Sequence, residues 1–186
     1  MVDVSTDALR SLIRDIPDFP EPGILFKDIT PLLSDPEGLD SAVEALAAPW
    51  RGQRVENVAG IEARGFILAA PVALALGAGF VPVRKAGKLP AGVISETYDL
   101  EYGSDTIEIH RDALEPGSRI LVIDDVLATG GTAAATGRLI RSSGAEIVGF
   151  GFLLELVALR GRARLVDPID VVIAFDAEPD PGREGR

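Results

Sequence analysis

The segment from Val122 to Ala133 combines the pattern of a buried strand with residues that can bind an anion and hydroxyl groups. Its apolar run ends at Asp124 and Asp125, and a Thr-Gly-Gly-Thr turn over 129–132 then opens a helical pattern. Glycines let backbone N–H groups approach an anion, threonines add hydroxyl donors, and a helix start adds free N–H groups and a favourable dipole. The pattern predicts a phosphate-binding loop.

The paired aspartates beside this loop need a second ligand group, because carboxylates repel phosphate. They suit vicinal hydroxyls or a hydrated cation held next to the phosphate, and phosphate plus diol indicates a ribose 5-phosphate group. Neither the Walker Gly-Lys-Ser/Thr nor a G-x-G-x-x-G after a strand is present. The structural alternative is an aspartate cap before a tight strand-to-helix turn.

Cationic residues occur at two further strand ends. Arg64 follows a predicted strand over 55–61 and precedes a predicted helix, where it could reach an anion at the helix mouth. Arg84, Lys85 and Lys88 lie within one short stretch of a chain whose formal net charge is −11, and such a local positive patch suits a polyanion. The alternatives are surface charges beside a helix start and a solvated strand end.

The elements that would position these residues alternate along the chain. Strands are predicted over 55–61, 80–84, 119–124, 147–154 and 171–175, and helices over 65–76 and 131–142. Continuous apolar strands alternating with helices predict a doubly wound α/β fold, a mainly parallel sheet with helices on both faces. Ligands of such sheets bind beyond the carboxyl ends of the strands, where the candidate residues fall.

The first fifty residues precede this pattern. A helix is predicted over 5–16, an irregular Pro/Gly-rich segment follows, and a second helix is predicted over 38–48 with Asp35 or Ser34 as its cap.

The segment over 86–105 contains Gly87, Gly92 and Gly103 and few apolar residues before Tyr98. With the strands predicted over 96–101 and 106–110, it is interpreted as a lid or as an ordinary long hairpin. We expect one domain over 1–186, with a core sheet in 55–176 and a frayed tail over 178–186.

Composition excludes several classes. The chain has 186 residues, 47% hydrophobic and 25% charged, which is typical of a globular domain. Its negative charge disfavours nucleic acid as a partner. No cysteine and a single histidine, His110, exclude thiolate and multi-histidine metal sites. The uncharged stretch 65–83 contains Pro71 and a Gly-Ala-Gly turn, so it predicts a buried helix and strand rather than a membrane span.

The signature over 124–132 matches that of type I phosphoribosyltransferases, and the chain resembles this family, in particular its adenine-using members. The other matching segments are 17–31, 60–66, 83–90 and 100–103, which with the signature cover 17 to about 133 in order. The resemblance implies transfer of phosphoribose from phosphoribosyl pyrophosphate to adenine in purine salvage. AMP and pyrophosphate would be the products, and Mg²⁺ the cofactor.

The resemblance also implies roles for individual residues. Phosphoribosyl pyrophosphate would be bound by Asp124, Asp125, Ala128, Thr129, Gly130, Gly131, Thr132, Arg64, Arg84, Lys85 and Lys88. Adenine would be bound by a hood formed by Leu25, Phe26 and Lys27, in which the ring stacks on the base and the flanking backbone reads its edge. The family often has Arg where this chain has Lys27, a harmless change if only the backbone contacts adenine.

Catalytic roles fall to Arg64 and to Glu101, which would handle a proton of the purine; a solvated hairpin charge is the alternative for Glu101. Mg²⁺ would bind mainly through substrate and water, with Asp124 as a candidate ligand. A cytoplasmic homodimer is expected, in which Arg84 and Lys85 serve the neighbouring subunit's site.

Two other functions stay open at this point: transfer to another purine base such as hypoxanthine or xanthine, and a non-catalytic regulator that senses phosphoribosyl pyrophosphate. No helix-turn-helix pattern with basic recognition residues accompanies the predicted sheet.

Overall fold

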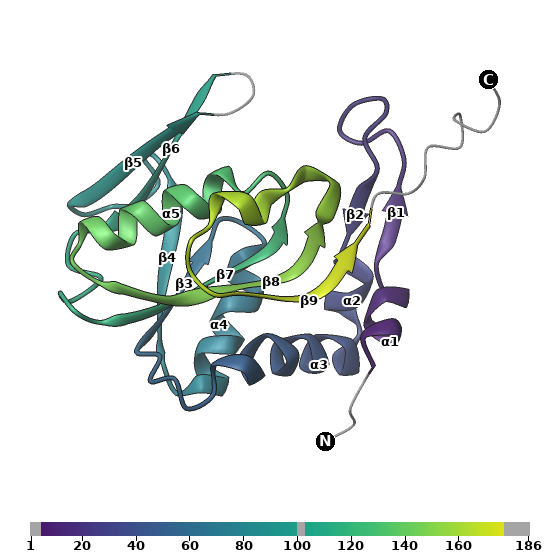
Figure 1. The fold of residues 1–186 in the computed structure, drawn as a ribbon, viewed down its shortest axis with the longest axis horizontal. Helices are drawn as coiled ribbons and strands as arrows, with labels where there is room; N and C mark the ends of the chain where they lie inside the picture. Colours follow the sequence, from purple (N-terminus) through teal and green to yellow (C-terminus); the bar gives the residue numbers. More distant parts are fainter. Residues whose placement is uncertain (1–4, 100–102, 177–186) are drawn as a thin grey trace.

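A computed structural model describes residues 5–99 and 103–176 of the protein. In these residues a seven-stranded sheet has the order β5-β6-β4-β3-β7-β8-β9 (Figure 1). Its strands are β3 (Asn57–Ile61), β4 (Gly79–Lys85), β5 (Val93–Asp99), β6 (Ser104–His110), β7 (Arg119–Leu127), β8 (Glu146–Leu156) and β9 (Ile169–Phe175). β4, β3, β7, β8 and β9 pair in parallel, whereas β6 is antiparallel to both β4 and β5.

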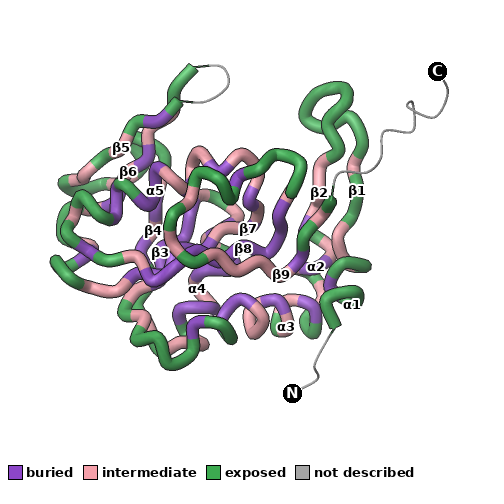
Figure 2. The backbone as a smooth tube through the Cα atoms, in the orientation of Figure 1, coloured by how far each residue is buried: buried purple, intermediate pink, exposed green. Residues whose placement is uncertain are grey.

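Helices cover both faces of the sheet, as the sequence predicts. α3 (Pro36–Ala47) and α4 (Gly65–Leu76) lie on one face, and α5 (Gly131–Ser142) lies on the other (Figure 1). A hydrophobic core lies on each face of the sheet, and the central strand β7 contributes to both. Leu121 and Ile123 pack on the side of α3 and α4, and Ile120 and Val122 pack on the side of α5. The buried segments of Figure 2 accordingly run through the middle of the sheet.

The helices flanking the sheet begin and end close to the predicted residues. α4 and α5 have the predicted bounds, and α3 begins after Asp35, whose carboxylate accepts the Gly38 N–H at 2.7 Å. The uncharged stretch 65–83 forms α4 and β4. None of the helices in the described part of the chain has the length and apolar character needed to span a membrane.

β7 is longer than predicted. It continues beyond Asp124 to Leu127, because these residues keep pairing with β8, as in the pairs of Asp124 with Phe152 and Val126 with Leu154. The two aspartates therefore belong to the end of a paired strand, which fixes their backbone.

The prediction of one helix over 5–16 is wrong in its second half. α1 (Thr6–Ser11) is followed by β1 (Arg14–Ile16), which pairs antiparallel with β2 (Phe26–Asp28). Ile16 precedes a proline, which disfavours helical backbone there, and Arg14 Nη2 lies 2.6 Å from Asp28 Oδ2 across the pair.

Short helical segments complete the described chain. They are α2 (Thr30–Ser34), which the sequence pattern does not predict, and the 3₁₀ turns η1 (Ala48–Trp50), η2 (Val157–Leu159) and η3 (Gly161–Arg164).

Candidate active site

A cavity of about 450 Å³ lies at the carboxyl ends of β3, β4 and β7, the edge at which ligands of such sheets bind. It is lined by Ile61, Glu62, Ala63, Arg64, Val83, Lys85, Tyr98, Asp105, Ile107, Asp124, Asp125 and Thr132. The structure thus gathers predicted residues from the loop after β3, the end of β4 and the signature. Tyr98 and Asp105, from the β5–β6 hairpin, were not predicted.

The aspartate pair and Arg64 form the centre of this cavity. Arg64 Nε lies 2.7 Å from Asp125 Oδ2, and the Asp125 N–H donates to Asp124 Oδ1 at 2.9 Å. Burial raises the pKa of Asp124 well above its ordinary value, and the charge of Asp125 adds to this effect. Burial also raises the pKa of Asp125, although Arg64 opposes the shift. Hydroxyl donors or a cation would favour the ionised pair.

Gly65 permits the close approach that holds this centre together. A Cβ at this position would lie 2.7 Å from Asp124 Oδ1 and 3.2 Å from the Ile123 carbonyl oxygen. The first residue of α4 can therefore lie against the end of β7 only without a side chain, which also brings Arg64 next to the aspartates.

The predicted phosphate-binding loop runs from Ala128, just after β7, to Thr132 in the first turn of α5. Gly130 has φ +76°, and a Cβ there would collide with the Gly161 carbonyl oxygen. This glycine is therefore required by the loop's own packing. The Thr132 hydroxyl is hydrogen bonded to Tyr98 at 3.0 Å, so the β5–β6 hairpin is tied to the loop.

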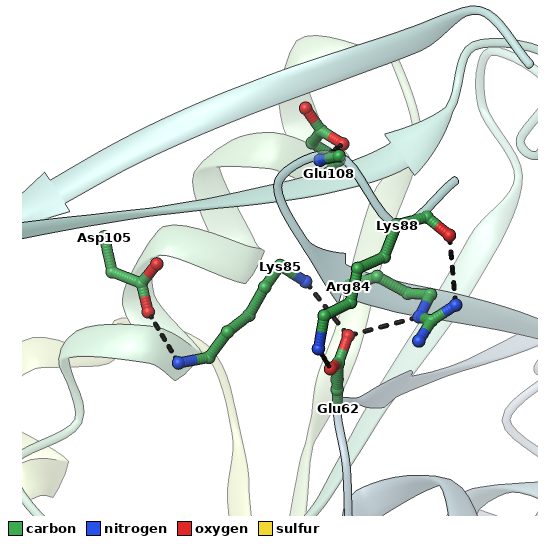
Figure 3. Close-up of polar contacts among 7 residues, drawn as sticks. Glu62, Arg84, Lys85, Lys88, Asp105 and Glu108 are labelled. Carbon is green, nitrogen blue, oxygen red and sulfur yellow. Dashed lines mark hydrogen bonds and ion pairs between the residues drawn. The ribbon is translucent and has the colours of Figure 1, made fainter. Parts of the chain in front are cut away.

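The predicted cationic patch is not a free positive surface, and the structure corrects that part of the prediction. Arg84 and Lys88 are both paired with Glu62, and Lys85 Nζ lies 3.1 Å from Asp105 Oδ2 (Figure 3). The hydrogen bond and charge of Asp105 raise the pKa of Lys85. Each cation has a carboxylate partner from another strand or loop, which a count of local charges could not reveal.

The predicted hood segment contacts the site through Arg64. The Arg64 guanidinium carbon lies 5.0 Å from the centre of the Phe26 ring, and that ring packs edge-on against Phe19 at 5.1 Å. Lys27 is held elsewhere, since its amine lies 2.7 Å from Asp15 Oδ1 and 4.3 Å from the Phe175 ring centre. Its side chain is thus engaged away from Phe26, and Leu25 beside it is partly exposed.

Some residues of the site could not be predicted from local sequence patterns. Tyr98 and Asp105 face each other in the β5–β6 register, and only that register and the contacts with Thr132 and Lys85 give them a place in the cavity. Arg164 of η3 lies beside Gly131, where a Cβ would be 3.4 Å from its guanidinium. The predicted catalytic Glu101 lies outside the described residues.

The side chains of the site fit a metal ion that is coordinated mainly by substrate oxygens and water, with only one or two protein carboxylates. The described part of the chain contains no cluster of three or more His, Cys, Asp or Glu residues that could hold a metal. Mg²⁺ commonly uses one or two carboxylates together with water and substrate phosphates, and Asp124 and Asp125 offer such a pair.

Comparison with known proteins adds independent evidence. A family model described as phosphoribosyl transferase domain matches residues 40–177. The adenine phosphoribosyltransferase of Thermobifida fusca is 61% identical over 165 residues, covering 89% of this chain and 93% of that protein. The chain belongs to the adenine phosphoribosyltransferase family. The predicted glycosyltransferase enzyme of the adenine type is thereby confirmed, together with its fold class.

Solved structures of adenine phosphoribosyltransferases superpose over most of the chain. The enzyme from Rhodothermus marinus gives a TM-score of 0.88 at 56% identity and covers 91% of this chain and 98% of its own. The enzyme from Saccharomyces cerevisiae, solved with an imino-altritol bisphosphate and adenine, gives 0.86 at 39% identity, covering 90% and 97%. The family match begins at residue 40, so the hood lies outside the segment that the general phosphoribosyl transferase domain describes.

Proposed function

We propose that this adenine phosphoribosyltransferase joins N9 of adenine to C1′ of phosphoribosyl pyrophosphate, releasing pyrophosphate and forming AMP for purine salvage. One observation carries the proposal: Arg64 contacts both Asp125 of the signature and Phe26 of the hood. A single guanidinium therefore joins the segment assigned to the phosphoribosyl group to the segment assigned to the base.

Positioning and charge would account for most of the catalysis. Asp124 and Asp125 would hold the ribose hydroxyls, and the loop from Ala128 to Thr132, including Thr129, Gly130 and Gly131, would hold the 5′-phosphate. The departing pyrophosphate would be held by Arg64 and by the cationic group of Arg84, Lys85 and Lys88. The C1′–oxygen bond breaks as the C1′–N9 bond forms, so fixed donors at the leaving group lower the barrier.

Mg²⁺ is the proposed cofactor, held by substrate oxygens and water with Asp124 as a candidate ligand, and it would neutralise charge on the pyrophosphate. Binding would favour the ionised aspartates, whose pKa values are raised by burial in the unliganded protein. Phosphoribosyl pyrophosphate with Mg²⁺ should therefore lower these pKa values on binding, so that the number of protons released changes with pH, which titration calorimetry at several pH values, each in two buffers of different ionisation enthalpy, would measure.

Adenine would stack on Phe26, with the backbone of Leu25 and Lys27 reading its edge. The position of the Lys27 amine, engaged by Asp15 and Phe175, supports a backbone role for this residue. Residues 1–50 would contribute the N-terminal helices and the hood, and the segment 86–105 would act as the lid. Glu101 in that lid would exchange a proton with the N7 side of the purine while N9 loses its own.

We also propose a homodimer. Ile67 and Leu74 lie seven residues apart on α4 and are 46% and 82% exposed, and Phe80 at the start of β4 is 37% exposed. Apolar side chains on one helix face support burial against a second copy.

The sites of the two copies could also share residues. Lys85 lines its own chain's cavity, so its predicted service to the partner's site needs a direct test. Mixing Arg84→Ala protein with inactive Asp124→Asn protein should restore activity if these cations act across the dimer. No recovery after verified subunit exchange would mean that each site is self-contained.

The remaining partners follow from this reaction. Adenine and phosphoribosyl pyrophosphate are the proposed small-molecule partners, without nucleic acid or membrane. We place the enzyme in the cytoplasm, since charged phosphorylated substrates and products do not cross a bilayer unaided.

The decisive experiment offers each purine base in turn. The protein is incubated with phosphoribosyl pyrophosphate, Mg²⁺ and adenine, hypoxanthine, guanine or xanthine, and the nucleotide is quantified. Adenine should be used fastest at matched concentrations. Faster use of another base would overturn the specificity, and binding of phosphoribosyl pyrophosphate without any nucleotide would support a sensing regulator.

A further inference from the structure

A single carboxylate, that of Glu62, contacts Arg84, Lys85 and Lys88 of the cationic segment at the end of β4 (Figure 3). Its Oε2 accepts hydrogen bonds from Arg84 Nε and from the Lys85 backbone N–H, both at 3.1 Å. Its Oε1 is paired with Lys88 Nζ. Both oxygens are thus used, and the donors come from a segment more than twenty residues away in sequence.

Glu62 is held as an anion at neutral pH. Its side chain is only 10% exposed, and this burial acts to raise its pKa. The hydrogen bonds from Lys88, the Lys85 N–H and Arg84 outweigh burial and leave the pKa below its ordinary value. A carboxylate that is nearly buried, ionised and hydrogen bonded through both oxygens fixes the positions of its donors, which a solvated surface charge would not do.

The segment from Arg84 to Lys88 folds back around this centre. Gly87 turns the chain with φ +78°, and its N–H donates to Glu108 Oε2 at 2.9 Å. Arg84 Nη1 donates to the Lys88 carbonyl oxygen at 3.0 Å, which closes the turn. Two cationic side chains that would repel each other are thereby brought to the same carboxylate.

This arrangement leaves donors for a ligand. Arginine has five N–H donors and an ammonium has three, so the contacts with Glu62 and the Lys88 carbonyl occupy only part of each group. The inner donors face Glu62, and the remaining donors can face an anion. Glu62 also adjoins Arg64 through the loop after β3, and it lines the cavity that contains the aspartate pair.

We propose that Glu62, itself anchored by the Lys85 N–H, is a positioning residue that pre-assembles the side chains of Arg84 and Lys88 into the pyrophosphate-binding group. The inference rests on the proposed function, because it takes the pyrophosphate of phosphoribosyl pyrophosphate as the anion. It assigns to a negatively charged residue the task of strengthening the binding of a polyanion.

This assignment gives an expectation opposite in sign to that of charge alone. If Glu62 acted only through its charge, removing that charge would tighten the binding of pyrophosphate. If Glu62 positions the cations, replacing it by an amide, which presents N–H donors of its own toward Arg84 or Lys88, weakens the binding despite the more favourable net charge.

The experiment compares Glu62→Gln with the matched control Glu108→Gln. Both remove one negative charge from the same cluster, but Glu108 contacts the Gly87 N–H, which an amide oxygen can still accept. Binding of magnesium pyrophosphate is measured by titration calorimetry, and KM is measured separately for phosphoribosyl pyrophosphate and for adenine.

Glu62→Gln should weaken pyrophosphate about tenfold to a hundredfold, the range for loss of one hydrogen bond to a charged group. KM for phosphoribosyl pyrophosphate should rise in step while KM for adenine stays within about twofold, because the loss is confined to one end of the site. Glu108→Gln should bind pyrophosphate as wild type does or slightly more tightly. Equal or tighter binding by Glu62→Gln would overturn the proposal.

A second variant keeps the test decisive if Glu62→Gln fails to fold. Glu62→Asp preserves the charge and shortens the reach by one methylene, so positioning predicts weaker pyrophosphate binding, and wild-type binding would contradict it. The proposed function fails separately: wild-type protein that does not bind magnesium pyrophosphate or form AMP would refute that function, whereas active wild type with an unaffected Glu62→Asp refutes only the role of Glu62.

Discussion

Gly65→Ala tests whether the close contact between α4 and β7 builds the active site. The added Cβ would lie 2.7 Å from Asp124 Oδ1, about 0.7 Å short of the 3.4 Å at which ordinary contact begins. Rotating the carboxylate does not relieve the clash cheaply, because Oδ1 accepts the Asp125 N–H and the Cβ also lies 3.2 Å from the Ile123 carbonyl oxygen. The helix start or the strand end must shift.

The expected magnitude follows from these contacts. Overpacking a well-packed site costs about 1–3 kcal/mol, and the higher helix propensity of alanine offsets up to about 1 kcal/mol of this. A net loss of about 1–2 kcal/mol lowers Tm by roughly 2–8 °C in a chain of this size. Displacing Asp124 should also raise KM for phosphoribosyl pyrophosphate about tenfold, while KM for adenine changes little.

Thermal unfolding of the unliganded protein and steady-state kinetics measure both effects. Gly92→Ala is the stability control, because no atom lies within 4 Å of a Cβ there and its φ is not positive. The reasoning would be refuted by a Gly65→Ala protein that melts with the wild type and keeps its KM for phosphoribosyl pyrophosphate. A fall in Tm with no change in that KM would refute the link between this contact and Asp124.

Other substitutions test the remaining parts of the site. Asp124→Asn should weaken phosphoribosyl pyrophosphate binding yet raise the Tm of the unliganded protein at pH 7. Burial raises this carboxyl's pKa, so folding disfavours its ionised form; the Tm gain should shrink as the pH falls toward about 4, and a gain independent of pH would contradict this. Phe26→Ala should raise KM for adenine about tenfold, as expected for lost stacking, and an unchanged value would remove Phe26 from the base site. Glu101→Gln should lower kcat about 10²–10⁴-fold and remove one limb of the pH–rate profile, whereas a change below about threefold would indicate a solvated charge.

Much of the fold could be predicted because its signals are local. The apolar pattern of α4 ends at Gly77, whose left-handed backbone (φ +66°) closes the helix, and the Gly130-Gly131 pair marks the start of α5. The predicted phosphate-binding loop and the aspartates lie within one short segment, so their proximity could be predicted without knowledge of long-range contacts.

The N-terminal segment shows where local signals fail. The spacing of Leu9, Leu12, Ile13 and Ile16 suits a helix, yet only Thr6–Ser11 is helical. The later residues pair with β2 instead, and the Arg14–Asp28 contact that accompanies this pairing joins residues 14 positions apart. The pKa of Asp28 also depends on its neighbours, because hydrogen bonds from the Thr30 hydroxyl, the Thr30 N–H and Arg14 lower it to about 2.

The cationic segment shows the same limit for electrostatics. Counting charges along the sequence finds Arg84, Lys85 and Lys88 and predicts a positive patch that attracts a polyanion. In the fold, each of these side chains pairs with a carboxylate from another strand or loop, and the Gly87 N–H between them donates to the carboxylate of Glu108.

With Glu62, Asp105 and Glu108 included, three formal negative charges balance three positive ones. Attraction at a distance is therefore weak at this point of an acidic chain, because field strength depends on the sum of nearby charges. Affinity for pyrophosphate must then come from donors held at fixed positions within contact range. The proposed role of Glu62 meets that requirement, because its nearly buried carboxylate holds Arg84 and Lys88 in place.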